Sequence, residues 1–194
     1  MPTSPQPQSR TSIADYLDGE QATDVKHEYL GGQVVAMGGA SDKHGLISLS
    51  LATLLHPHAR RKACQLFMGD MKVRVDHDGD SYFYYPDLLL SCQPDDKESP
   101  YYRRSPCLLV EVLSPSTERI DSREKLLAYR LLPSLREYLL LRQDRVQADL
   151  YQLGDEGRWQ HQVFTQPDEV LALRCLEVAV SLRDVYADVP ELLA

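Results

Sequence analysis

The chain has 194 residues, of which 43% are hydrophobic and 26% are charged, and this composition is ordinary for one sizeable globular domain. Its 21 Lys and Arg residues and 29 Asp and Glu residues give a formal charge of −8, which argues against broad electrostatic binding of nucleic acid and leaves room only for a local basic face. No apolar stretch approaches the roughly 18 residues of a membrane span, and the N-terminus lacks the apolar segment of a signal peptide. We therefore expect a cytoplasmic protein with no membrane insertion.

The four cysteines, Cys64, Cys92, Cys107 and Cys175, are scattered and form no C-x-x-C pair. Three of them lie in or beside apolar runs, where a cysteine usually packs as a small buried hydrophobic residue. This usage predicts a reducing setting and free thiols.

Residues 1–11 are rich in Pro, Ser and Gln and are expected to form a disordered tail, so that residues 12–194 make up the single predicted domain. Apolar spacing and capping residues predict helices at residues 12–17, 42–62, 118–132 and 182–186. Period-2 patterns and turn residues predict a hairpin at 26–37 and strands at 65–68, 71–75, from 82 onward, 107–113, 137–141, 146–153, 158–164 and 176–180. The order predicts an α/β fold with a mixed β-sheet flanked by helices and with β-rich C-terminal hairpins.

Glu111 is the residue that most needs an explanation. It lies in the middle of the apolar run from Cys107 to Leu113, which is too short for a globular helix and rich in branched residues, as in a strand buried on both faces. Glutamate is almost never fully buried unless it is paired, because an uncompensated buried carboxylate costs several kcal/mol. We therefore expect a cation partner or a metal ion beside Glu111.

Two further charged residues are expected close to Glu111. The stretch from Tyr82 to Leu90 repeats the pattern, with Asp87 at the mouth of a second apolar strand. Lys125 lies in the predicted helix 118–132, which follows the Glu111 strand directly. Two carboxylates and a lysine are thus delivered by neighbouring elements of the chain.

This set of residues predicts a metal site for phosphate chemistry. Mg²⁺ takes oxygen ligands, usually one or two carboxylates, with water and substrate phosphate completing the shell, and Mn²⁺ could replace it. Asp87 and Glu111 on neighbouring strands meet this requirement, and the backbone carbonyl of Val112 could add a third oxygen. Lys125, protonated beside two carboxylates, would stabilise the negative charge of a transition state. The residues therefore predict metal-assisted hydrolysis of a phosphodiester.

The same residues carry a resemblance to known nucleases. Pro86-Asp87, followed by Glu111 within an apolar strand, resembles the PD-(D/E)xK nuclease superfamily. More narrowly, residues from about 13 to about 186 resemble the Uma-type restriction endonuclease family, through the segments Glu28-Tyr-Leu-Gly-Gly-Gln, Pro86-Asp87, Val110 to Thr117, and Glu124 to Tyr129. This resemblance implies a restriction-endonuclease-like core, DNA as the substrate and a homodimer.

One position departs from the superfamily pattern. The lysine of E-x-K would fall at position 113, which is Leu113 in this chain. In the Uma-type branch the following helix supplies the lysine, and Lys125 occupies that place. The resemblance also implies that Glu28 joins the site as an additional acid, whereas its position beside a Gly-Gly turn would by itself indicate a solvated hairpin residue.

Each of these residues also has a purely structural interpretation. Glu111 could form a salt bridge with an arginine or with Lys125, and Asp87 by itself would be a loop-edge aspartate after a proline. Lys125 by itself would be a solvated lysine in a mixed charged patch. His44, in the first turn of the predicted helix 42–62, could approach the site, and similar histidines occur in related Uma-type sequences, but we expect a surface histidine near the start of a helix.

We therefore predict a Mg²⁺-dependent endonuclease in which Asp87 and Glu111 bind the metal, Lys125 stabilises the transition state and Glu28 is a supporting acid. A second hypothesis is a catalytically silent structural or partner-binding module with a vestigial nuclease site, which would have no need of the metal. A third is a metal-dependent hydrolase of a smaller phosphate ester. Metal titration distinguishes the second hypothesis from the first, and a comparison of DNA with small phosphodiesters as substrates distinguishes the third from the first.

Overall fold

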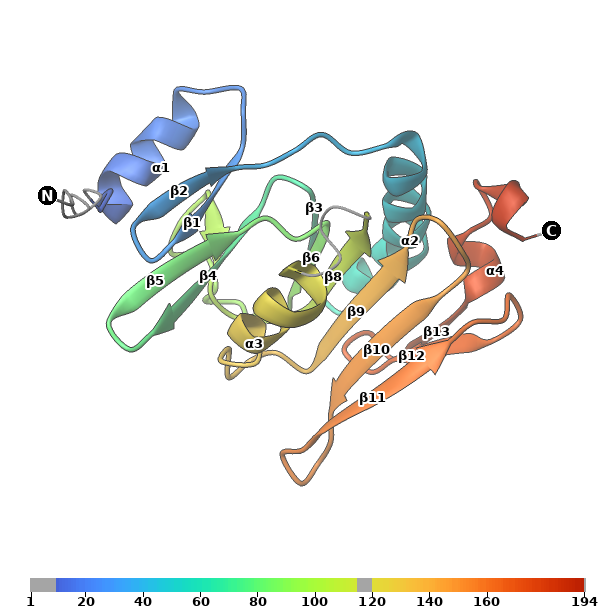
Figure 1. Ribbon diagram of the computed structural model, residues 1–194. Coiled ribbons are helices and arrows are strands. Elements are labelled where there is room, and N and C mark those ends of the chain that lie inside the picture. Colours follow the sequence, from blue (N-terminus) through green and yellow to red (C-terminus); the bar gives the residue numbers. More distant parts are fainter. Residues whose placement is uncertain (1–9, 115–119, 194) are drawn as a thin grey trace, which may run out of the picture.

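The computed structural model describes residues 10–114 and 120–193, and three sheets with few helices form an α/β fold in this part of the chain (Figure 1). The expected class is therefore confirmed. Most of the predicted N-terminal tail, the predicted start of the helix at residue 118 and the Ser116-Thr117 end of the family motif lie outside the described residues. At the near end of the tail, Thr11 N donates to the Gly32 carbonyl and Arg10 pairs with Asp80.

The first sheet has five strands in the order β2-β1-β5-β4-β7. Its neighbours are antiparallel except for the parallel pair β4 and β7. The strands are β1 (His27–Leu30), β2 (Gln33–Ala36), β4 (Lys72–His77), β5 (Asp80–Tyr84) and β7 (Tyr102–Arg103). The hairpin of β1 and β2 turns at Gly31 and Gly32, both with positive φ, as the sequence predicts.

The second sheet has six strands in the order β11-β10-β9-β8-β6-β3, and β8 lies in its interior. Only the pair β8 and β9 is parallel, so this sheet is mixed. The strands are β3 (Gln65–Met68), β6 (Leu88–Ser91), β8 (Pro106–Leu113), β9 (Glu137–Arg142), β10 (Ala148–Leu153) and β11 (Trp159–Phe164). The predicted strands thus divide between sheets, and the two-residue β7 forms inside a segment that carries no strand signal.

The helical elements cover the sheets from several sides (Figure 1). They are α1 (Ile13–Gln21), α2 (Asp42–Arg61), the π-helical η1 (Ile120–Lys125), α3 (Leu126–Tyr129), α4 (Leu182–Val185) and the 3-10 helix η2 (Pro190–Leu192). Ser41 caps α2 by accepting a hydrogen bond from His44 N, and the helix continues through Pro57 to Arg61. No helix of the described segments is both long and apolar enough to cross a membrane.

A two-stranded third sheet of β12 (Val170–Leu173) and β13 (Val178–Ser181) completes the C-terminal part. The sequence predicts β13 but not β12, whose four residues alternate between exposed and buried positions over too short a stretch to stand out. The hairpin of β12 and β13 and the short helix α4 pack into the same core as α2.

The side chains of β8 alternate between two hydrophobic cores, because successive residues of a strand point to opposite faces. Leu108, Val110 and Val112 pack with α2 and the C-terminal elements. Leu109 and Leu113 pack with α3 and with one face of the five-stranded sheet. The other face of the five-stranded sheet is covered by α1, through a small aromatic core. The sheet that carries Glu111 is thus covered on both faces.

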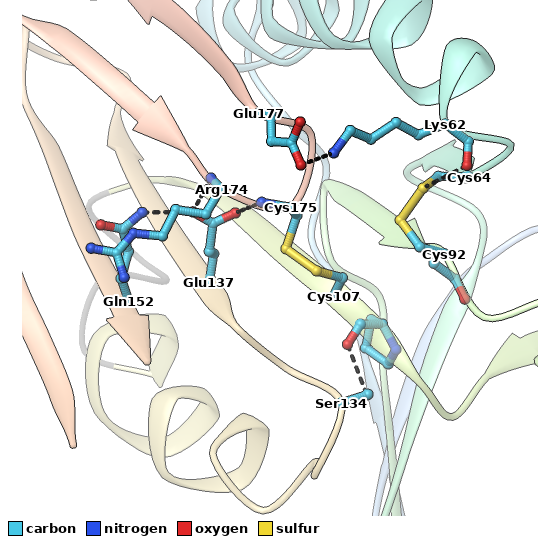
Figure 2. The surroundings of a disulfide bond; sticks show 12 residues. Lys62, Cys64, Cys92, Cys107, Ser134, Glu137, Gln152, Arg174, Cys175 and Glu177 are labelled. Carbon is cyan, nitrogen blue, oxygen red and sulfur yellow. Dashed lines mark hydrogen bonds and ion pairs between the residues drawn. A yellow bond between two sulfur atoms is a disulfide. The ribbon is translucent and has the colours of Figure 1, made fainter. Parts of the chain in front are cut away.

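All four cysteines are paired, so the prediction of free thiols is wrong. Cys64 is bonded to Cys92, and Cys107 is bonded to Cys175 (Figure 2). The partners are 28 and 68 residues apart in the chain, and spacings that wide give no pairing signal to a reader of the sequence. The first disulfide links the start of β3 to the end of β6, and the second ties β8 to the turn between β12 and β13.

A buried carboxylate reinforces the same attachment. Glu137, at the start of β9, is fully buried and accepts hydrogen bonds from the backbone amides of Arg174 and Cys175 and from the side chain of Gln152 (Figure 2). Hydrogen bonds to a charged acceptor contribute more than bonds between neutral groups. Glu137 and the Cys107–Cys175 disulfide therefore fix the C-terminal hairpin onto the sheet beside β8.

The two disulfides give the first testable prediction. Replacing both cysteines of a pair by serine should destabilise the protein by about 4 kcal/mol, the loop-closure entropy that the bond removes from the unfolded chain. The Cys107/Cys175 pair closes the longer loop, so its loss should cost about 0.8 kcal/mol more than the loss of Cys64/Cys92. Urea unfolding of the two double variants measures the difference, and a larger effect at Cys64/Cys92 would contradict this loop-length ordering.

Candidate functional site

Glu111 lies in the interior of β8 and is only 3% exposed. Its position between Leu109 and Leu113 places its side chain on the face that packs with α3 and the five-stranded sheet. A carboxylate at this depth needs partners of its own, as the sequence predicts. Its partners come from the helical segment that crosses this face.

Lys125 and Tyr129 supply these partners. Lys125 Nζ lies 3.2 Å from Glu111 Oε1, and the Tyr129 hydroxyl donates a hydrogen bond of 2.9 Å to the same oxygen. Lys125 is the last residue of η1 and is 4% exposed, while Tyr129 ends α3 and is fully buried. Residues four apart share a helix face, so one face of this segment delivers both groups. Lys125 is therefore not the solvated lysine of the structural interpretation.

Glu28 approaches from the other sheet. It lies in β1, and its Oε1 is 3.0 Å from Lys125 Nζ. This oxygen is buried and makes no hydrogen bond of good geometry to the described residues, so the ion pair with Lys125 is its compensation. The Lys125 ammonium thus lies between two carboxylates, one from each large sheet. The residue pattern alone could not place Glu28 there, and the family resemblance did.

Asp87 enters the same region at the start of β6. The register pairs Leu88 with Val110, so the antiparallel geometry brings Asp87 opposite Glu111. Asp87 Oδ2 accepts a short hydrogen bond of 2.6 Å from the backbone amide of Val112. The side chain of Asp87 is therefore held against the end of β8.

The backbone of Val112 points toward Asp87 as well. The Leu113 carbonyl accepts a bond from Gln143 N, next to β9, so the backbone groups of Leu113 face β9. Backbone groups of successive strand residues face opposite neighbours, and the N–H and C=O of one residue face the same neighbour. The Val112 carbonyl therefore faces the β6 side, where Asp87 lies.

His44 lies at the site, a position that the sequence interpretation considered but set aside in favour of the surface. Its Nε2 lies 3.1 Å from Asp87 Oδ2, and its side chain is only 17% exposed, so the expectation of a surface histidine is wrong. The first turn of α2 delivers it, with Ser41 accepting from its backbone amide. The signals in the sequence were its place in the first turn after the Ser41 cap, which many solvent-facing residues share, and the family resemblance.

The tyrosines around the cluster are neutral donors. Burial, and after it the nearby Glu111 carboxylate, raises the pKa of the Tyr129 hydroxyl well above its ordinary value. Burial, followed by the charge of Glu28, likewise raises the pKa of Tyr84, whose ring lies 5.9 Å from Lys125 Nζ. At neutral pH, the Tyr129 hydroxyl therefore stays protonated and can donate its hydrogen bond to Glu111. The charges of the cluster are those of the carboxylates and the lysine.

A fourth carboxylate, Glu20 near the end of α1, supports the segments that carry Glu28 and Asp87. It accepts hydrogen bonds from Tyr85, two residues before Asp87, at 2.5 Å, and from the backbone and ring of His27, which precedes Glu28. Burial raises the pKa of Glu20, but the bonds from Tyr85 and His27 and the charge of Lys72 outweigh it, and the net pKa is lowered. Glu20 therefore acts as an ionised clamp behind the site.

The described residues contain no ready-made metal-binding cluster. Among residues 10–114 and 120–193, no group of three or more His, Cys, Asp or Glu side chains is arranged to hold a metal ion. A hard cation such as Mg²⁺ needs fewer protein ligands, because one or two carboxylates suffice when water and substrate fill the remaining positions. The roles of Asp87, Glu111, Lys125, Glu28 and Val112 in chemistry stay predictions.

Comparison with known proteins identifies the family. Residues 13–185 match the Uma2 family, described as "Putative restriction endonuclease". The match spans most of the chain, so the chain belongs to this family, and the expected resemblance is confirmed. Two curated relatives come from Synechocystis sp., the uncharacterized proteins slr1290 and sll1609. The first is 39% identical over 158 residues and covers 81% of each chain. The second is 29% identical over 149 residues and covers 76% of this chain and 84% of its own.

A solved structure shares the fold. The crystal structure of a putative nuclease belonging to DUF820 from Anabaena variabilis superposes with a TM-score of 0.70 and 16% identity, covering 85% of this chain and 92% of that chain. At this identity the likeness concerns the fold alone. It agrees with the expected α/β architecture built around a mixed sheet.

Removing the Lys125 charge should destabilise the protein, because the buried carboxylates then lose their cation partner. Lys125→Met keeps the volume of the side chain but leaves Glu111 and Glu28 without their shared cation, and we expect a loss of about 3–5 kcal/mol in the free energy of unfolding at neutral pH. The matched control is Lys43→Met, which breaks the exposed pair with Glu191 and should cost less than about 1 kcal/mol. Urea unfolding compares them, and equal losses would show that the buried ion pair does not stabilise the fold.

Glu20 should make the free energy of unfolding depend on pH in the acidic range. Its folded pKa lies below the ordinary 4.5, so its ionised form stabilises the fold fully above that pH, and the contribution is lost as the pH falls through the folded pKa. We expect Glu20→Gln to destabilise the protein at a pH of about 7 and to differ less from the wild type at a pH of about 3. Glu98→Gln, on an exposed carboxylate paired with Arg104, is the control. A difference in unfolding free energy between Glu20→Gln and the wild type that stays constant with pH would contradict the stabilising role of ionised Glu20.

Proposed function

We propose that this member of the Uma2 family is a Mg²⁺-dependent endonuclease that hydrolyses phosphodiester bonds in DNA. The observation that carries the proposal is the position of the Lys125 ammonium between the Glu111 and Glu28 carboxylates, with Asp87 entering opposite Glu111. A buried cluster of charged groups with a further acid beside it is a candidate functional site. The family description and the nuclease-like fold support the same conclusion.

The residues present fit a hard cation. Asp87 and Glu111 offer carboxylate oxygens, and the Val112 carbonyl faces the side of β8 on which Asp87 lies. Glu28 Oε1, which is buried and pairs with Lys125 but makes no hydrogen bond to the described residues, is a further carboxylate oxygen at the site. Bound there, Mg²⁺ or Mn²⁺ would supply Lewis acidity toward a phosphoryl oxygen and lower the pKa of a bound water.

The side chains of the chain itself have separate tasks in this proposal. Lys125 offers a fixed positive charge where the negative charge of the phosphoryl group increases, and its two carboxylate partners hold it in place. Tyr129 fixes the orientation of Glu111 through the hydrogen bond to Oε1. His44 and the Val112 amide fix Asp87 in the same way. Glu111 and Asp87 are then already oriented before a phosphate binds.

DNA as the substrate is the part of the proposal that depends most on the family. The net charge of −8 opposes a long electrostatic footprint, so we propose that contact with DNA is local and depends on the metal. The proposed place of action is the cytoplasm, where DNA and Mg²⁺ are both present. The two disulfides are unusual for that compartment, and they make the redox state of the purified protein a variable to control.

One observation favours a second candidate, a catalytically silent module. Lys125 already has two carboxylate partners, and Asp87 already accepts bonds from His44 and from Val112 N. A cluster of this kind can serve only to stabilise a buried polar junction between the sheets. Such a module would bind no divalent cation at this position, and calorimetric titration with Mn²⁺ decides between the two.

The proposed function predicts the loss of metal binding and of cleavage together. Asp87→Asn keeps the acceptor for Val112 N but removes the charge, and we expect it to abolish Mn²⁺ binding in calorimetry and to reduce Mg²⁺-dependent cleavage of plasmid DNA by about 100-fold or more. Glu111→Ala should likewise abolish cleavage while the circular dichroism spectrum stays that of a folded protein.

Asp80→Asn is the control, because Asp80 is half-exposed and pairs only with Arg10 among the described residues. It should cleave and bind metal as the wild type does. Retained cleavage in Asp87→Asn and Glu111→Ala would remove the assignment, and metal binding without cleavage of DNA but with hydrolysis of a small phosphodiester would redirect it to a smaller substrate.

A further inference from the structure

We propose that β11 is the edge through which two copies of this chain pair, forming one continuous sheet across a twofold axis. The inference stands apart from the proposed function, because it concerns the outer strand of the six-stranded sheet and none of the site residues. It rests on three features of β11: an unprotected sequence, a regular set of outward-facing backbone groups, and a register in which the strand matches itself.

β11 lacks the features that normally protect an edge strand. Soluble proteins usually block such edges with charged side chains, proline, bulges or a covering element. The strand Trp-Gln-His-Gln-Val-Phe from Trp159 to Phe164 contains no Asp, Glu, Lys, Arg or Pro, and it pairs with β10 over all six residues without a bulge. Its four central residues are exposed, Val163 to 50%. Within the described chain, β11 pairs with β10 on one side and with no strand on the other.

The backbone hydrogen bonds show which groups face outward. Leu153 N donates to the Arg136 carbonyl, so the odd-numbered residues of β10 face β9 and its even-numbered residues face β11. Gly154 N donates to the Arg158 carbonyl, which agrees with this assignment. The register pairs Gln152 with Gln160 and Leu150 with Gln162, so the even-numbered residues of β11 face β10. Trp159, His161 and Val163 therefore direct their N–H and C=O groups away from the sheet.

These three residues are self-complementary. A twofold axis perpendicular to the sheet keeps each face of the sheet on its own side, so antiparallel partners must be an even number of residues apart. An axis at His161 meets this condition. It pairs His161 with its own copy and each Trp159 with the Val163 of the other copy, and every outward N–H and C=O of the three residues finds a partner.

The side chains agree with this register. On one face Trp159 would lie beside the partner's Val163, an aromatic and β-branched pair of the kind that stabilises antiparallel sheets. On the other face Gln160 would lie beside the partner's Gln162, where the amides can bond to each other. His161 is stacked on Tyr151 and lies 2.8 Å from an Asp149 carboxylate oxygen, so an acidic group stands beside each imidazole at the axis.

The other long exposed edge is a poorer match. Met37 N donates to the Lys26 carbonyl, which makes Val34 and Ala36 the outward-facing residues of β2. This edge offers only these two residues, against three in β11, and the Gly31-Gly32 turn limits its extension. A partner strand from a different protein could use the open edge of β11, but nothing in such a strand would need to match Trp159 and Val163 as a second copy does. The observations therefore favour a homodimer.

The experiment is the molar mass of the full chain in solution, measured by light scattering and by sedimentation at micromolar concentrations. The wild type should have the mass of two chains. Val163→Lys, which places an edge-protecting charge beside the partner's Trp159, should have the mass of one. Val35→Lys on β2 is the matched control, because Val35 is 45% exposed on the other edge, and it should stay dimeric. Circular dichroism and thermal melting confirm that each variant is folded.

Hydrogen exchange gives a readout that needs no variant. The amides of Trp159, His161 and Val163 should be protected at high protein concentration and lose that protection on dilution, whereas the amides of Gln160 and Gln162 should stay protected at both. The chain contains 1 Trp, so the fluorescence of Trp159 should shift to longer wavelength on the same dilution. A monomeric wild type, a Val163→Lys variant that stays dimeric, a Val35→Lys variant that dissociates, or outward amides whose protection ignores dilution would each overturn the proposal. Loss or retention of nuclease activity has no bearing on these outcomes.

Discussion

The ion pair between Glu111 and Lys125 is the interaction on which the centre of the molecule depends. Glu111 lies in an interior strand with apolar neighbours on both sides along the chain, and an ammonium and a hydroxyl that share its Oε1 compensate its burial. Lys125 in turn is also compensated by Glu28 on its other side. Each large sheet contributes a carboxylate to this cluster, and the helical segment contributes the cation between them. The charge balance at the junction therefore requires the two large sheets and the crossing helical segment to assemble together.

The route of the chain explains why these groups meet. β8 runs parallel to β9, and the connection between them must cross one face of the sheet, which is the face that Glu111 occupies. η1 and α3 lie in that connection, and the change from π-helical to α-helical geometry falls between Lys125 and Leu126. π-helical turns are rare and frequently accompany functional sites. The position of Lys125 at this change is what aims it between Glu111 and Glu28.

Much of this could be read from the sequence, and the failures share a cause. A lone glutamate inside an apolar run indicated a buried charge, and the helical pattern directly after that strand placed Lys125 near it, because both signals are local in the chain. The division of the strands into three sheets, the position of His44 beside Asp87, and the two disulfides depend on contacts between distant segments. Cys107 and Cys175 are 68 residues apart, and no periodicity encodes such a contact. Glu28 was placed only through the family resemblance, because its local pattern is that of an ordinary hairpin residue.

The same ion pairs that stabilise the fold also set a condition for the proposed chemistry. In the proposed function, a phosphate that entered the site would compete with Glu28 for the Lys125 ammonium, since both are oxygen anions that bind the same donor. Glu111 keeps the Tyr129 hydrogen bond during this exchange, so the carboxylate in the interior of β8 is not left without a partner. Glu28 is the more exposed of the two acids, with 12% of its side chain accessible against 5% for Glu111, so loss of its ion pair with Lys125 would cost less free energy. The unequal burial of the two carboxylates thus allows Lys125 to change partners at the outer side of the cluster while the inner side holds the fold.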